Sequence, residues 1–144
     1  LGRLQAVLAC VLVVTIVGGA AIRAPAVSED MNSYLIPFFD EEEFVTALLL
    51  DTTDAARPLL VNAGHPPPLL SHPDQTCEFL ETDADLPLGL GERYTCHEFE
   101  WRPGDRLLLY TDGVSEARDA SGAFLDLREL GPLLVGGPLQ PAAR

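Results

Sequence analysis

The spacing of hydrophobic residues predicts helices in the first part of the chain. Residues 6–22 form an apolar run without a charged side chain, and we expect an apolar helix within residues 1–24. In residues 25–39 apolar side chains recur at the spacing of an amphipathic helix, which Pro37 ends. This second helix carries Val27, Met31, Tyr34 and Leu35 on its apolar face.

The pattern changes at residue 44 to short apolar runs separated by turn residues. Residues 44–63 contain two such runs and predict a β-hairpin. The prolines at 66–68 exclude a central strand there, because proline cannot donate a hydrogen bond to a neighbouring strand. Residues 93–101 alternate between two faces, and residues 106–110 predict a buried strand. The fold class is therefore α+β, with helices covering one face of an antiparallel sheet.

Residues 6–22 leave three interpretations open. The run is close to the length of a membrane-spanning helix. Its basic start and the "APA" that follows imitate a secretory signal peptide. Gly18 and Gly19 suit the end of a buried core helix. We favour the core helix and a cytoplasmic protein over a membrane anchor, because the rest of the chain is typical of a globular domain.

Composition and charge narrow the range of functions. The chain of 144 residues is long enough for one domain with a core, and 47% of it is hydrophobic. Its 22 acidic and 9 basic residues give a formal net charge of -13, which repels phosphate backbones and argues against nucleic-acid binding. The three cysteines form no C-x-x-C pair, so we expect neither a disulfide framework nor a zinc site. Reduced thiols fit a cytosolic protein.

Asp112 and Gly113 follow the predicted strand 106–110 in "RLLLYTDGVSEARD". Asp-Gly often closes a β-hairpin, but the residues after Gly113 lack the alternation of a second strand. We therefore expect a strand, the Asp-Gly pair, and then a helix or loop. Asp112 is either a turn residue or an oxygen ligand of Mg²⁺ or Mn²⁺, and Gly113 lets the backbone approach what the carboxylate binds. No residue has the surroundings of a catalytic nucleophile, and none is assigned as catalytic.

Asn62 and His65 are polar residues at the end of a predicted apolar strand, in "NAGHPPP". One interpretation is a turn in which Asn and Gly adopt positive φ and His65 is exposed. The other is that both side chains line a pocket.

Four stretches occur in a characteristic order within residues 25–130: "FVTALLL", "LLVNAGHPPPLL", "LPLGL" and "WRPGDRLLLYTDGVSEARDASGAF". Together they resemble the SpoIIE-like branch of the metal-dependent (PPM-type) serine/threonine phosphatases, which includes bacterial regulators of sigma factors. The resemblance implies a sandwich of two antiparallel β-sheets flanked by helices. It also implies two Mn²⁺ or Mg²⁺ ions and hydrolysis of phosphoserine or phosphothreonine on a regulatory protein, such as an anti-sigma-factor antagonist.

The resemblance assigns roles to four residues of this chain. It makes Asp112 a metal ligand and Gly113 a part of the same motif. It carries over Asn62 and His65 only as groups that support the metal ligands or face the substrate.

The chain also departs from that family. The upstream Gly-Asp-Trp/Tyr-Asp motif, the Asp-x-x-Gly-His-Gly stretch and the final Asp-Asp pair are absent. We therefore expect a fragment with an incomplete metal site, in which residues 25–135 are part of a phosphatase domain. Within it, residues 126–135 begin a helix that Gly131-Pro132 interrupts, and residues 136–144 form a tail. Two functions remain open: a metal-dependent phosphatase, or a catalytically inert phosphatase-like module that binds a partner.

Overall fold

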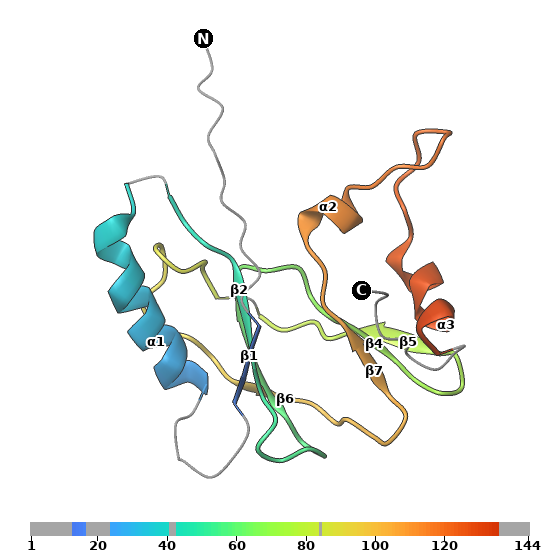
Figure 1. The fold of residues 1–144 in the computed structure, drawn as a ribbon, viewed down its shortest axis with the longest axis horizontal. Helices are drawn as coiled ribbons and strands as arrows, with labels where there is room; N and C mark the ends of the chain where they lie inside the picture. Colours follow the sequence, from blue (N-terminus) through green and yellow to red (C-terminus); the bar gives the residue numbers. More distant parts are fainter. Residues whose placement is uncertain (1–12, 17–23, 41–42, 84, 136–144) are drawn as a thin grey trace, which may run out of the picture. The chain divides into compact units, whose positions relative to one another are not determined.

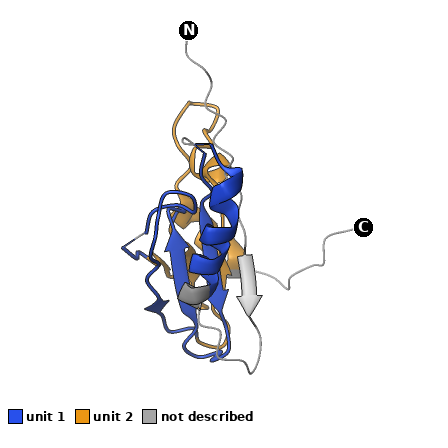
Figure 2. Cartoon of the chain, turned by 90° about the vertical axis from the view of Figure 1, so that its left-hand side faces the viewer, with its two compact units in different colours: residues 1–66, 81–101 blue, residues 67–80, 102–144 orange. Residues whose placement is uncertain are grey.

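The chain forms two compact units, and each is built on one β-sheet. Residues 1–66 and 81–101 make the first unit, and residues 67–80 and 102–144 make the second (Figure 2). Helices accompany both sheets (Figure 1), so the predicted α+β class is confirmed, while the sandwich arrangement of the sheets stays a prediction. The computed structural model describes residues 13–16, 24–40, 43–83 and 85–135.

The first unit contains a four-stranded sheet in the order β1-β2-β3-β6. Strands β2 (Ala47–Asp51) and β3 (Leu59–Ala63) form the predicted antiparallel hairpin, and β6 (His97–Glu98) pairs antiparallel with β3. Every residue of β2 and all but the first residue of β3 are buried. A strand buried on both faces needs apolar side chains at nearly every position, which explains the continuous apolar run in the sequence.

Strand β1 (Val13–Ile16) lies where we predicted a helix within residues 1–24, so that prediction is wrong at these positions. β1 pairs with β2 in parallel, which is an exception to the expected antiparallel sheet. All of its residues are β-branched, and such side chains favour strands. A short apolar run does not distinguish a buried helix from a buried strand by its periodicity alone.

The other residues of the predicted apolar helix, 1–12 and 17–23, lie outside the described part of the chain. Most of the run 6–22, with its membrane alternative, falls there too. Among the described residues, no helix has both the length and the apolar character that crossing a membrane requires.

Helix α1 (Ala24–Leu35) confirms the predicted amphipathic helix, and it continues into the 3-10 helix η1 (Ile36–Phe38). The α-helix ends before Pro37 because proline has no N–H to donate to the carbonyl four residues earlier and its ring clashes with that carbonyl. The other predicted apolar side chains of α1 pack against the core of the first unit, but Tyr34 is 71% exposed.

Two polar side chains, Ser28 and Asn32, are buried on the inner side of α1. Asn32 donates from Nδ2 to the Gly91 carbonyl (2.8 Å) and accepts from the Gly89 N–H (2.7 Å). The inward face of α1 is therefore centred on these polar residues, and Tyr34 lies outside it.

The second unit contains a three-stranded antiparallel sheet in the order β5-β4-β7. Its strands are β4 (Leu69–Ser71), β5 (Cys77–Phe79) and β7 (Arg106–Leu108). β4 is buried throughout, whereas β7 is only half-buried, which differs from the fully buried strand that we predicted there.

Two short helices follow in the second unit. The 3-10 helix η2 (Leu127–Glu129) leads directly into α3 (Leu130–Val135), which packs against β4. Gly131 and Pro132 therefore lie in the first turn of α3, where proline is tolerated because its missing N–H has no helical partner. The interruption that we predicted at Gly131-Pro132 therefore corresponds to the start of α3, just after the 3-10 helix η2 ends. The Ser71 hydroxyl donates to the Gly131 carbonyl at 2.9 Å and joins β4 to α3.

The Leu49→Ala substitution tests the core of the first unit. Leu49 is fully buried in the hydrophobic cluster around β2 and β3. Its truncation should lower the free energy of unfolding by about 2–5 kcal/mol, measured by urea denaturation. Leu86→Ala is the control, because Leu86 is 59% exposed and its truncation should cost no more than about 0.5 kcal/mol. Equal losses would show that β2 is not in the core.

Candidate functional site

Asp112 is the first residue of the short helix α2 (Asp112–Ser115), which begins shortly after β7 ends. Thr111 precedes it in an extended conformation, with φ -103° and ψ 170°. The Val114 N–H then donates to the Thr111 carbonyl at 2.9 Å, and the Glu116 N–H donates to the Asp112 carbonyl at 2.8 Å. The segment is therefore a transition from strand to helix, as predicted, and the hairpin alternative is excluded.

The Asp112 carboxylate is exposed to solvent, and no side-chain hydrogen bond within the described part of the chain engages it. Gly113 is exposed as well. A Cβ added to Gly113 would meet only the Thr111 hydroxyl oxygen, at 3.6 Å, so there is open space beside Gly113. A cation can therefore reach Asp112 from solvent.

The acids that follow Asp112 serve local turns. Asp119 Oδ1 accepts hydrogen bonds from the Ser121 hydroxyl (2.5 Å), the Ser121 N–H (2.8 Å) and the Ala123 N–H (3.1 Å). These bonds, the one from the Ser121 hydroxyl foremost, lower the pKa of Asp119. Asp126 accepts from the Arg128 N–H (3.0 Å) at the start of η2. Both carboxylates thus stabilise the backbone around them.

A metal ion needs more oxygen ligands than Asp112 provides. In the residues that the structure describes, no group of three His, Cys, Asp or Glu side chains is arranged to hold a metal ion. These residues therefore do not fit a complete two-metal centre, and no step of a hydrolysis follows from them. What they offer is one exposed carboxylate.

Asn62 and His65 belong to a closed turn at the end of β3. The Asn62 side chain donates from Nδ2 to the His65 carbonyl (2.8 Å) and accepts from the His65 N–H (2.7 Å). His65 Nδ1 lies 2.9 Å from the Thr46 hydroxyl oxygen. Gly64 supplies the positive φ of the turn, at +67°. The turn interpretation is therefore confirmed for Gly64.

Burial changes the rest of that interpretation. Asn62 is 2% and His65 4% exposed, so His65 is not the exposed residue that the turn interpretation expected. Asn62 lies within β3 and contributes its side chain, not a positive φ. Side chains so deeply buried present little surface in this structure. Their roles, as groups that support a metal ligand or face the substrate, stay predictions.

The four predicted site residues fall into two pairs. Asn62 and His65 lie together in the first unit, and Asp112 and Gly113 lie together in the second. Because the members of each pair are close in sequence, we could expect each pair to lie together. Asn32 holds α1 through a buried hydrogen bond, and Thr46 is hydrogen-bonded to His65. The hydrophobic pattern of the sequence did not indicate either contact.

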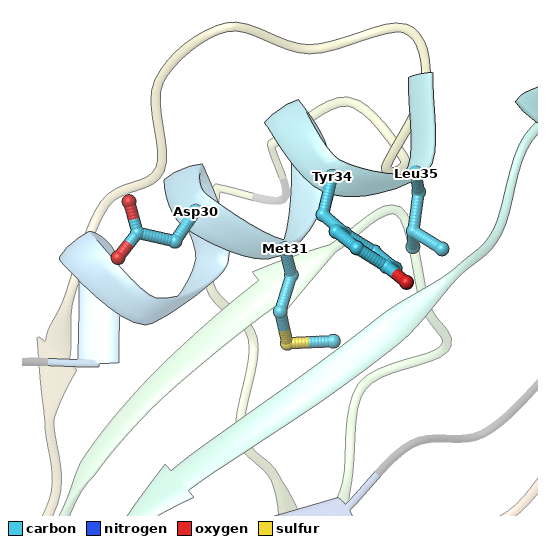
Figure 3. Close-up of a pocket in the computed structure, with 4 residues that line it drawn as sticks. All are labelled: Asp30, Met31, Tyr34 and Leu35. Atoms are coloured by element: carbon cyan, nitrogen blue, oxygen red, sulfur yellow. The ribbon is translucent and has the colours of Figure 1, made fainter. Parts of the chain in front are cut away.

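A cavity of about 450 Å³ lies against α1 in the first unit. Figure 3 shows the side chains that line it, which belong to Asp30, Met31, Tyr34 and Leu35. Only one of these side chains is charged, and it is acidic. The cavity is therefore unsuited to a phosphate group.

Comparison with known proteins identifies the class. A family model described as stage II sporulation protein E (SpoIIE) matches residues 4–143. Because this match spans nearly the whole chain, the chain belongs to the SpoIIE family and is a phosphatase-type domain. The resemblance drawn from the sequence motifs is thereby confirmed.

The chain is also similar to a crystal structure of the RsbU and RsbW domains of Rv1364c from Mycobacterium tuberculosis. The sequence identity is 29% and the TM-score is 0.45. The match covers 56% of this chain and 22% of that chain, so it spans about a fifth of the chain in that crystal structure.

The Gly64→Ala substitution tests the turn that Asn62 and His65 form. An added Cβ would lie 2.5 Å from the Pro87 Cγ, in addition to the cost of φ +67°. Gly122→Ala is the matched control, because Gly122 also has a positive φ (+86°) but nothing within 4 Å of an added Cβ. We expect the control to cost about 1–2 kcal/mol of stability in thermal unfolding, and Gly64→Ala about 1–3 kcal/mol more. Equal losses would mean that the Pro87 ring moves aside freely.

Proposed function

We propose that this chain takes part, as a PPM-type phosphatase domain, in the metal-dependent hydrolysis of phosphoserine or phosphothreonine on a regulatory protein. The partner is a phosphorylated protein of a sigma-factor pathway, such as an anti-sigma-factor antagonist. The observation that carries the proposal is the exposed carboxylate of Asp112, in a chain of the SpoIIE family. It lies at a strand-to-helix transition, and no side chain of the described residues is hydrogen-bonded to it.

In this proposal Asp112 is one ligand of Mn²⁺ or Mg²⁺. Both ions prefer carboxylate oxygens. A bound ion supplies Lewis acidity toward a phosphoryl group. Gly113 follows Asp112, and a Cβ added there would meet only an ordinary contact with the Thr111 hydroxyl oxygen. Two ions, as expected for the family, need carboxylates in addition to Asp112.

The alternative function is a catalytically inert, phosphatase-like module that binds its partner without hydrolysing it. The observation that favours it is the lack of a three-residue metal cluster among the described residues. A site with a single carboxylate binds divalent ions weakly. In both proposals the protein works in the cytoplasm, which suits a reduced thiol such as that of Cys77.

The decisive comparison is Asp112→Asn against Glu116→Gln in the full-length product of the gene that encodes this chain. Both substitutions remove one negative charge from exposed side chains of the same segment. Loss of residues that merely support a ligand costs 10–100-fold, so loss of a ligand should lower the Mn²⁺-dependent kcat/KM on a phosphoserine protein by at least about 100-fold. Glu116→Gln should leave it unchanged.

Other outcomes have a definite meaning. If Asp112→Asn and Glu116→Gln behave alike in an active protein, Asp112 is not a metal ligand. If the full-length protein binds a phosphorylated partner but hydrolyses nothing with Mn²⁺ or Mg²⁺, the inert binding module is correct.

A further inference from the structure

His72 lies between two carboxylates in the second unit. It follows β4 directly, and its Nδ1 is 2.8 Å from Asp105 Oδ1. Its Nε2 is 3.5 Å from Glu78 Oε1. Asp105 belongs to the turn before β7, and Glu78 is the central residue of β5. The imidazole ring therefore contacts the neighbouring strand of its own β4-β5 hairpin and a turn that is 33 positions away in the sequence.

The two carboxylates differ in their surroundings. The Asp105 side chain is 2% exposed, and its Oδ2 accepts the Arg102 N–H at 2.9 Å, so the turn holds it in place. The Glu78 side chain is 63% exposed and projects from β5, which is an edge strand. The His72 side chain is 26% exposed, so it can exchange a proton with solvent.

The two contacts also depend differently on the charge of the ring. A neutral imidazole has one N–H, and its bond to Asp105 places that proton on Nδ1. This contact is therefore present whether or not the ring is charged. Nε2 can donate to Glu78 only in the imidazolium. After deprotonation, the Nε2 lone pair faces a carboxylate, and neither group has a proton to donate.

We propose that His72 is a pH-sensitive clamp, which links the edge strand β5 to the turn before β7 when its imidazole is protonated and loses this link, while β5 stays paired with β4, when Nε2 loses its proton.

The charged groups around the ring favour the protonated form of His72 that the clamp requires. The hydrogen bond to Asp105 raises the pKa of His72, burial opposes this, and the charges of Asp105 and Glu78 add to the increase. Burial alone would raise the pKa of Asp105, but the bonds from the Arg102 N–H and His72 hold it below its usual value, so Asp105 stays ionised. Asp74, in the turn after β4, adds a further exposed negative charge.

The other charged groups on the packed elements, Arg106, Arg128 and Glu129, are not among those that shift the pKa of His72. Arg106 of β7 donates to the Leu134 carbonyl, and Arg128 of η2 lies over the Phe79 ring at 5.4 Å. Helix α3 has no charged residue.

The direction of the pH effect follows from the raised pKa of His72. Protonated His72 stabilises the folded unit fully below the ordinary histidine value of 6.5. This stabilisation is lost as the pH rises through the raised value. Between the two values, the opening equilibrium changes by up to about tenfold per pH unit.

An NMR titration of the histidine rings in the intact chain, with Glu78→Gln as the variant, tests the clamp. Glu129→Gln is the control, because it removes an exposed charge from the same unit and Glu129 is not one of the groups that shift the pKa of His72. We expect His72 to titrate above 6.5, Glu78→Gln to lower that value, and Glu129→Gln to leave it unchanged. Asp105→Asn should lower it further. Because Glu78 is exposed, its variant remains informative even if Asp105→Asn fails to fold.

Hydrogen exchange supplies a second readout. The protection factors of the β5 amides should be higher in the unmodified chain than in Glu78→Gln at pH 5.5. At pH 8.5 they should be no higher than in the variant, because the Gln amide can donate to the Nε2 lone pair of the neutral ring. A His72 that titrates at or below 6.5 would overturn the proposal. So would a protection difference of the same size at both pH values.

Discussion

Buried backbone N–H and C=O groups have to be hydrogen-bonded, and β2 is the strand in which this constraint is most severe. All of its residues are buried, and β1 and β3 pair with it on its two sides. The loop around Leu88 extends the same hairpin, because Val45 and Leu88 exchange backbone bonds at 2.9 and 2.8 Å. Helix α1 is tied to this loop through Asn32. The buried hairpin thus determines where the helix and the loop lie in the first unit.

The turn after β3 shows how this constraint reaches the candidate site. The Asn62 carbonyl accepts the Asp85 N–H at 2.9 Å, and its side chain satisfies the backbone of His65. An unbonded amide at such a buried position would cost about 1–3 kcal/mol. The Asn-Ala-Gly-His sequence is therefore explained by the backbone it has to satisfy, before any role near a metal is considered.

Much of the local structure could be predicted from the sequence. The hairpin of residues 44–63 followed from two apolar runs, and the strand-to-helix transition at Asp112 followed from the missing alternation after it. The strand at residues 13–16 could not be distinguished from a helix, because a short apolar run fits both. The surroundings of His72 could not be predicted either, since Asp105 lies 33 positions away and meets it only through the sheet of the second unit. Long-range contacts of this kind leave no periodic signal in one sequence.

The central claim concerns the exposed carboxylate of Asp112, and paramagnetic broadening by Mn²⁺ tests it most directly. Substoichiometric Mn²⁺ is added to the isotope-labelled full-length protein, and the loss of amide NMR signals is mapped along the chain. Our account predicts that the strongest losses are centred on Thr111, Asp112 and Gly113, and that Mg²⁺ in excess restores the signals. Losses centred on another acidic segment, such as that of Asp119, with the Asp112 signals intact, would contradict it.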